Sequence, residues 1–175
     1  SDVCSSDLAV TRIALVRPNG VSATQYISAA SNSSGFEFRF NGANLSGVRA
    51  GVAEFYSGAH GLSANQLACV GITVNASASA GYVNGKQIST SGGADFSSSG
   101  STNCAFGMRE GATNGWGGEI YAHLEFKRVL TTSEMIFLTA PSGIWQAFQL
   151  PRMQYDFAPT VVVVNTLAGA RSNRM

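Results

Sequence analysis

The sequence predicts an all-β protein: a single domain of antiparallel strands. From Thr11 onward, short apolar segments alternate with clusters of Gly, Asn and Ser. Only 12% of the 175 residues are charged and 20 are Gly, a composition typical of turn-rich β structure. Several segments also alternate apolar and polar residues with the period of two that a half-buried strand requires. A chain of this length can bury a sizeable core without disulfides.

The apolar segments predict strands over 11–17, 22–29, 35–41, 47–55, 66–75, 79–89, 103–109 and 117–127. In the segment GFEFRFNG, Phe36, Phe38 and Phe40 share one face, and Glu37 and Arg39 share the other. Because side chains alternate across a strand, the phenylalanine face is expected to belong to the core.

The segment 66–75 places Ala68, Val70, Ile72 and Val74 on one face, which we expect to be buried. It then turns through NASASAG into GYVNGKQI, as a hairpin would. The dipeptide 84–85, Asn-Gly, supplies a further tight bend because both residues tolerate positive φ.

The segment 117–127 has the clearest alternation in the chain. Its even positions are apolar and are expected to face the core: Ile120, Ala122, Leu124 and Phe126. Its odd positions are polar or aromatic and are expected to face outward: Glu119, Tyr121, His123 and Glu125. For His123 this predicts a surface position.

One short helix is expected at 132–139. Thr131 is followed three residues later by Glu134, the spacing of a capping box, and Pro141 and Gly143 end the helical pattern. Residues 151–175 have a looser composition with one strand-like run, and we treat them as a C-terminal extension.

Composition also excludes several classes of function. The net charge is +1 and no basic stripe is present, so a nucleic-acid partner is not expected. No uninterrupted apolar run is longer than four residues, as in Val161 to Val164, which is far too short to span a membrane. Cys69 and Cys104 each lie in an apolar segment and are expected to act as small buried hydrophobes; a disulfide between them is the alternative.

Three pieces of sequence carry a family resemblance: GYVNGKQI (81–88), GWGGEIYAHLEF (115–126) and RVLTTSEM (128–135). In this order they resemble the laminin-G-like, concanavalin A-like jelly-roll family, over about residues 11–140. The resemblance implies a two-sheet antiparallel jelly-roll sandwich. The matching residues are a turn former, core positions and a helix cap, so they indicate the fold. IWQAFQLPRM, which follows, resembles what succeeds this domain in tailed-phage and prophage structural proteins, and so implies a virion protein; a secreted or extracellular protein is the alternative.

Glycoside hydrolases share the jelly roll, and an active member would carry a pair of catalytic carboxylates. A retaining pair needs carboxyl groups about 5–5.5 Å apart. Glu119 and Glu125 are expected on one strand face, and six residues of strand separate them by roughly 20 Å. A serine-hydrolase elbow, GxSxG, is absent. We therefore expect no enzymatic activity.

No metal or cofactor is expected from the motifs. Members of the jelly-roll family often hold calcium through loop carbonyls and one Asp, and Asp95 is the candidate in this domain. No calcium-loop motif of the DxDxDG type accompanies it.

Glycan binding needs an aromatic plate and nearby amide or hydroxyl groups. The loop GATNGWGG supplies Asn114 and Trp116, and Tyr121 follows on the outward face. Tyr56 and His60, in FYSGAHG, form a second candidate patch. The alternative for Trp116 is packing over the edge of the sandwich.

The sequence thus predicts a non-catalytic carbohydrate-binding or adhesion module of a phage tail, virion or prophage structural protein. The first alternative is a structural or decoration domain that docks on a neighbouring virion subunit. The second is a fragment of a glycoside hydrolase.

The first residues, SDVCSSDL, have no apolar period and no helix signal. Residues 1–8 resemble the translated end of a common sequencing adapter. The jelly-roll family usually has about one further strand before the segment TRIALVRPNG. We therefore expect 1–8 to be an artefact, 9–150 to be an N-terminally truncated jelly-roll domain, and 151–175 to be its extension.

Overall fold

A computed structural model describes residues 9–30, 35–49, 53–93, 104–109 and 115–149. The strands are β1 (Ala9–Pro18), β2 (Thr24–Ala30), β3 (Phe36–Asn41), β4 (Asn44–Arg49), β5 (Ala53–Ala59), β6 (Ala68–Asn75), β7 (Ala78–Val83), β8 (Lys86–Gly92), β9 (Cys104–Phe106) and β10 (Gly118–Phe126). The helices are α1 (Thr132–Thr139) and α2 (Gly143–Gln149).

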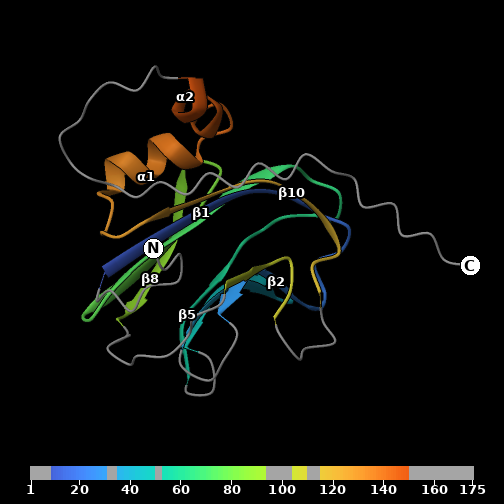
Figure 1. Cartoon of the computed structure of the whole chain (residues 1–175), viewed down its shortest axis with the longest axis horizontal. Coiled ribbons are helices and arrows are strands. Elements are labelled where there is room, and N and C mark those ends of the chain that lie inside the picture. The colour runs from blue at the N-terminus through green and yellow to red at the C-terminus, as the bar shows by residue number, and fades with distance from the viewer. Residues whose placement is uncertain (1–8, 31–34, 50–52, 94–103, 110–114, 150–175) are drawn as a thin grey trace, which may run out of the picture.

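The strands form two five-stranded antiparallel sheets, which confirms the predicted two-sheet sandwich. Sheet A has the order β10-β1-β6-β7-β8, and sheet B has the order β5-β4-β3-β2-β9. Figure 1 shows the two sheets as separate layers, with both helices above sheet A. Residues 1–8 and 151–175, for which an artefact and an extension were expected, lie outside the described residues.

The space between the sheets holds the main core. It contains Phe36, Phe38 and Phe40 from β3 and, from β6, Ala68, Val70, Ile72 and Val74. Both predicted apolar faces are therefore confirmed.

A second core lies between sheet A and the helices. Ile13, Leu15, Leu124, Met135 and Ile144 meet there. The strands β1 and β6 of sheet A are consequently buried on both faces, which explains why Cys69 and Thr73, on the opposite side of β6, are also buried. Cys69 is a free thiol, so the alternative of a disulfide to Cys104 is wrong.

Two local predictions are confirmed: the cap of α1 and the tight turn between β7 and β8. Thr131 and Glu134 form the capping box of α1, with both reciprocal hydrogen bonds present. Asn84 and Gly85 have φ values of 50° and 79° and join β7 to β8. The expected single strand at 47–55 is instead two strands, β4 and β5, and α2 was not expected at all.

The predicted outward row of β10 is wrong for two of its members. Leu15 pairs with Ala122 but Val16 pairs with Ile120, so Tyr121 is an extra residue that forms a β-bulge. The bulge reverses the alternation: Ile120 packs in the core between the sheets, and Ala122 and Leu124 pack under the helices. His123 and Glu125 therefore point into the sandwich, where they are 3% and 7% exposed.

A buried polar network accommodates these two side chains. Arg12 Nε donates to Glu125 Oε2 at 2.8 Å, and Arg12 NH1 donates to the Phe36 carbonyl at 2.9 Å. His123 Nε2 lies 3.1 Å from Ser28 Oγ. Burial and the nearby Arg12 cation lower the pKa of His123 to about 3, so its ring is neutral at ordinary pH.

Candidate functional site

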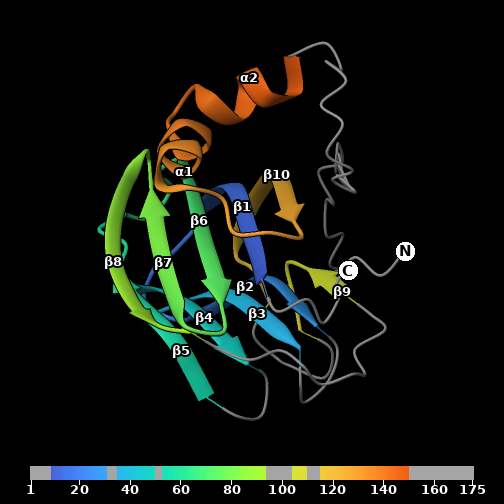
Figure 2. The ribbon, with the colours of Figure 1, turned by 90° about the vertical axis from the view of Figure 1, so that its left-hand side faces the viewer.

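Sheet B leaves its outer face free of the helices, since both helices lie over sheet A (Figure 2). On β3 the residues that point to this outer face are Glu37 and Arg39, because Phe36, Phe38 and Phe40 point inward. The register pairs Arg39 with Tyr26 of β2, which therefore shares that face. This face is the place where charged side chains gather on the open sheet.

Glu37 lies at the centre of the cluster and joins two arginines. Its Oε2 is 3.1 Å from Arg39 NH1 and its Oε1 is 3.1 Å from Arg109 Nε. The Glu37 side chain is 1% exposed, whereas those of Arg39 and Arg109 are 17% and 34% exposed. The carboxylate is thus buried beneath two guanidinium groups that still reach solvent.

Tyr26 supports both arginines from the side. The Arg39 guanidinium carbon lies 5.8 Å from the centre of the Tyr26 ring, within the range of a cation–π contact. Arg109 donates a hydrogen bond to the Tyr26 hydroxyl. We call Tyr26, Glu37, Arg39 and Arg109 the arginine cluster.

The electrostatics of the arginine cluster favour an anion. Two guanidinium groups face one carboxylate, so the cluster carries a net charge of +1 when Glu37 is ionised. Burial raises the pKa of Glu37, while Arg109 and Arg39 act in the opposite direction. The hydrogen bond to Tyr26 and the Glu37 charge raise the pKa of Arg109, which stays charged at every ordinary pH.

The sequence predicts part of this cluster, namely the shared face of Glu37 and Arg39. The charged residues of GFEFRFNG were assigned to the outer face of their strand, but nothing in the sequence brought Tyr26 or Arg109 beside them. Arg109 follows β9, more than 60 residues later in the chain. Only the pairing of β9 and β3 with β2 brings these segments together.

Two of the predicted glycan-binding residues are buried and unavailable to a ligand. Tyr56 is 1% exposed, and its hydroxyl lies 2.7 Å from Ser89 Oγ on β8, so it fixes sheet B against sheet A. His60 is 4% exposed and stacks on Phe40 with ring centres 4.5 Å apart. The patch predicted from FYSGAHG is therefore wrong.

The His60 ring is held in one tautomer. Its Nδ1 accepts from the Leu62 amide at 2.9 Å, so Nε2 carries the proton that it donates to the Gly42 carbonyl at 3.1 Å. Burial lowers the pKa of His60. Both hydrogen bonds hold the loop in place, and they leave neither ring nitrogen of His60 for a ligand.

Trp116 packs over the edge of the sandwich, which was the alternative for this residue. Its ring centre is 5.3 Å from that of Phe40, and it packs against the core between the sheets. The loop is fixed by Gln25, whose Oε1 accepts from the Gly117 amide at 3.0 Å. Asn114, its predicted partner, lies outside the described residues, as does Asp95.

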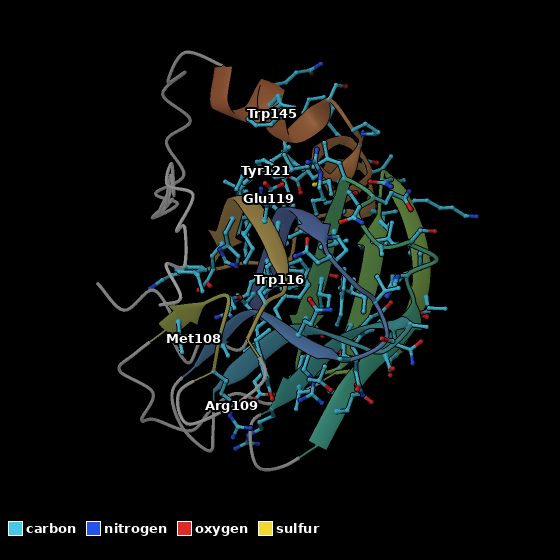
Figure 3. All side chains as sticks on the ribbon, turned by 90° about the vertical axis from the view of Figure 1, so that its right-hand side faces the viewer. Met108, Arg109, Trp116, Glu119, Tyr121 and Trp145 are labelled. Atoms are coloured by element: carbon cyan, nitrogen blue, oxygen red, sulfur yellow. The ribbon has the colours of Figure 1, made fainter. Side chains whose placement is uncertain are left out.

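Tyr121 is half-buried on the helix side of β10, far from the arginine cluster. Its hydroxyl donates to Glu119, and Arg17 pairs with Glu119 at 3.3 Å while lying 5.7 Å from the Tyr121 ring centre. The hydrogen bond to Glu119 raises the pKa of Tyr121. Figure 3 shows Tyr121, Glu119 and Trp145 near the helices, with Met108 and Arg109 at the opposite end.

Within the described ranges, no three His, Cys, Asp or Glu side chains come together as metal ligands. No helix in the same ranges is long and apolar enough to cross a membrane.

No protein-family model and no curated protein sequence matches this chain. Solved structures do match. The CBM40 of the Ruminococcus gnavus IT-sialidase, bound to alpha2,3 sialyllactose, superposes with a TM-score of 0.65 at 18% identity, over 77% of this chain and 84% of that one. A heptameric SAP-like pentraxin from Limulus polyphemus gives 0.62 at 15% identity, over 93% and 82%.

The leech intramolecular trans-sialidase contains a similar sandwich, with a TM-score of 0.61 at 16% identity over 78% of this chain and 24% of that one. At these identities the likeness concerns the fold. This chain shares the two-sheet sandwich fold of that CBM40 and that pentraxin.

Proposed function

We propose that this chain is a non-catalytic carbohydrate-binding module that takes acidic sugars on the outer face of sheet B. The observation that carries the proposal is the arginine cluster: two partly exposed guanidinium groups held side by side on one buried carboxylate. The fold supports it, because a neighbour with the same sandwich is a carbohydrate-binding module bound to alpha2,3 sialyllactose.

The geometry of the pair suits a sugar carboxylate. Arg39 uses NH1, and Arg109 uses Nε, to bind Glu37. Each planar guanidinium keeps further N–H donors, and such groups bind carboxylates through paired, charge-assisted hydrogen bonds. Glu37 offsets the repulsion between the two cations and fixes them before the ligand arrives, which lowers the entropy cost of binding.

Binding of glycan probes tests the site. We expect 3′-sialyllactose to bind and neutral lactose to bind at least tenfold more weakly, because removing a charge-assisted partner costs about 1.5–3 kcal/mol. Arg39→Ala and Arg109→Ala should each weaken sialyllactose binding at least tenfold. Titration calorimetry or surface plasmon resonance of immobilised glycans measures both effects.

Arg17→Ala is the matched control, because Arg17 is a partly exposed arginine that pairs with a glutamate on the other side of the molecule. It should bind sialyllactose as the unchanged protein does. Equal loss in the Arg17 and Arg39 variants would mean that general charge, and not this site, attracts the glycan. A blank array of sialylated, uronic and neutral glycans would reject the function.

We further propose that the module belongs to a tailed-phage or prophage structural protein and is located in the virion. The support is the likeness of IWQAFQLPRM, after the sandwich, to segments of such proteins. A secreted or extracellular protein is the alternative location. Mass spectrometry of purified virions would detect the chain in the first case, and its presence only in culture supernatant would favour the second.

Docking on a neighbouring subunit is the second candidate function, and the surface of the helices favours it. Ile136, Phe137 and Trp145 are large apolar residues that are 44–47% exposed on α1 and α2. This surface lies on the opposite side of the molecule from the arginine cluster, so docking would leave the glycan site open. Phe137→Ser should then release the chain from its assembly without changing sialyllactose binding.

A further inference from the structure

The outer face of sheet B continues past the arginine cluster along β3 and β4, which are neighbours in that sheet (Figure 2). Asn41 lies two residues beyond Arg39 on β3 and points to the same face, because side chains alternate along a strand. The register pairs Asn41 with Asn44 of β4 and with Thr24 of β2, so all three side chains share the outer face.

We call Asn41 and Asn44 the asparagine pair. Both residues are half-buried, so their side chains reach solvent. Asn41 Oδ1 accepts from Thr24 Oγ1 at 3.1 Å, which leaves the two N–H donors of Asn41 Nδ2 for another partner. The Asn44 side chain has no hydrogen-bond partner among the described residues. The asparagine pair therefore offers uncharged donors and acceptors beside the arginine cluster.

Two unpaired polar atoms lie where the asparagine pair meets the arginine cluster. The register places Ser46 of β4 directly beside Arg39 on the outer face. Ser46 Oγ and Arg39 Nε are buried, and neither has a hydrogen-bond partner within the described part of the chain. Because buried polar atoms are normally paired, two unpaired atoms side by side indicate a place where a ligand rich in hydroxyl groups would supply partners.

The turn that joins the two asparagines is held in place by His60. The His60 amide donates to the Ala43 carbonyl at 3.0 Å, and its Nε2 donates to the Gly42 carbonyl at 3.1 Å. The His60 ring is stacked on Phe40, the buried neighbour of Arg39 on β3. The asparagine pair is thus fixed relative to Arg39 before a ligand binds, which lowers the entropy cost of binding.

The spacing of the two groups suits two linked sugars. Two residues of strand span about 7 Å, so the asparagine pair lies about that far from Arg39 along β3. In a sialoside, the carboxylate and the glycosidic oxygen are bonded to the same carbon atom. A carboxylate held by Arg39 and Arg109 therefore leaves the linked sugar directly beside the arginine cluster, within reach of the asparagine amides.

We propose that the asparagine pair is a second subsite, which binds the neutral sugar linked to the acidic one. The inference rests on the proposed function of the arginine cluster and names its substrate class: acidic oligosaccharides rather than free acidic monosaccharides. Amide side chains suit a neutral sugar, because they donate hydrogen bonds to its hydroxyl groups and accept from them without adding charge.

Titration calorimetry of the full chain with two ligands tests the proposal. 3′-Sialyllactose carries the neutral sugar, and the methyl α-glycoside of N-acetylneuraminic acid lacks it. The unchanged chain should bind 3′-sialyllactose at least about tenfold more tightly, since each added hydrogen bond contributes about two- to tenfold in affinity. Asn41→Ala and Asn44→Ala should each weaken 3′-sialyllactose binding by about three- to tenfold, so the affinity ratio between the two ligands falls toward one.

Gln87→Ala is the matched control, because Gln87 of β8 is a half-buried amide that pairs with Tyr82 on the helix side of sheet A. It should leave the affinity ratio unchanged. Thermal melts check that each asparagine variant folds, and a ratio that stays high in both folded variants would overturn the proposal.

The same titrations separate this proposal from the proposed function. Equal affinities of the unchanged chain for the two ligands, with binding still lost in Arg39→Ala, would overturn the second subsite alone. Binding of neither ligand would overturn both the second subsite and the acidic-sugar site at the arginine cluster.

Discussion

The two outer faces of the sandwich begin from similar strands and end in opposite chemistry. The outer face of sheet A is covered by α1 and α2 and is filled by apolar side chains such as Leu124 and Met135. The outer face of sheet B has no described helix over it and carries the arginine cluster. We therefore expect substitutions on the covered face to change stability and substitutions in the arginine cluster to change the proposed binding.

The largest effect is expected on the covered face. Met135 of α1 is fully buried against Gly71 of β6, so Met135→Ala should lower the free energy of unfolding by about 2–5 kcal/mol. Glycan binding by the folded fraction should not change. Chemical denaturation measures the loss, and Ile136→Ala, on the exposed side of the same helix, is the control and should stay within about 1 kcal/mol. Similar losses in both variants would contradict the division between a covered and a free side of α1.

The next largest effect is the pH dependence of stability that comes from His123, which is buried between the two sheets. The His123 ring is neutral when folded, with a pKa of about 3, and takes up a proton near its ordinary pKa of 6.5 when unfolded. The free energy of unfolding should therefore fall as pH drops from 6.5 toward 3, by up to about 1.4 kcal/mol per pH unit from this group. Burial of His60 acts in the same direction.

Thermal melts of the unchanged protein and of His123→Gln between pH 7.5 and 4.5 isolate this contribution. Glu37 has the opposite effect on stability. Burial raises its pKa, so protonation of Glu37 favours the folded state as the pH falls. The His123→Gln variant should show a shallower decline than the unchanged protein. Parallel curves would mean that His123 is not buried as a neutral ring.

A smaller effect is expected at the start of α1. Thr131 Oγ1 accepts from the Glu134 amide at 3.3 Å, and Glu134 Oε2 accepts from the Thr131 amide at 2.7 Å. Thr131→Ala should cost about 1 kcal/mol of unfolding free energy. Thr131→Ser, which keeps the hydroxyl, should recover most of it in the same denaturation experiment.

The smallest effect should appear only in binding. Tyr26→Phe removes the hydroxyl that accepts from Arg109, which costs about 0.5–1.5 kcal/mol for one hydrogen bond. We expect a two- to tenfold weaker affinity for 3′-sialyllactose by calorimetry, with the cation–π contact to Arg39 retained. An unchanged affinity would show that Arg109 is held by Glu37 alone.

The elements that the sequence predicted correctly depend on neighbouring residues. The phenylalanine face of β3, the capping box of α1 and the Asn84–Gly85 turn each follow from side chains a few positions apart. The aromatic residues chosen for glycan binding were less successful. A Gly-rich loop suggested exposure for His60, but the loop folds back and stacks the ring on Phe40.

The alternation in β10 shows most clearly where sequence reasoning ends. The residues Ile120, Ala122, Leu124 and Phe126 were expected on one core face, and they do contact apolar neighbours, but in two different cores. One extra residue, Tyr121, shifts the register and turns His123 and Glu125 inward. A hydrophobic pattern cannot predict that Glu125 is buried, because its ion-pair partner, Arg12, lies more than 100 residues away in the chain.

The sequence by itself determined the class of fold, most strands, the cap of α1 and which residues of β3 face outward. These properties follow from backbone preferences and from the period of two, which act over a few residues. The tertiary structure alone decided which outward face stays open and which arginine joins Glu37. The cause is that Tyr26, Glu37 and Arg109 come from three different segments of sheet B, and only the order of its strands makes them neighbours.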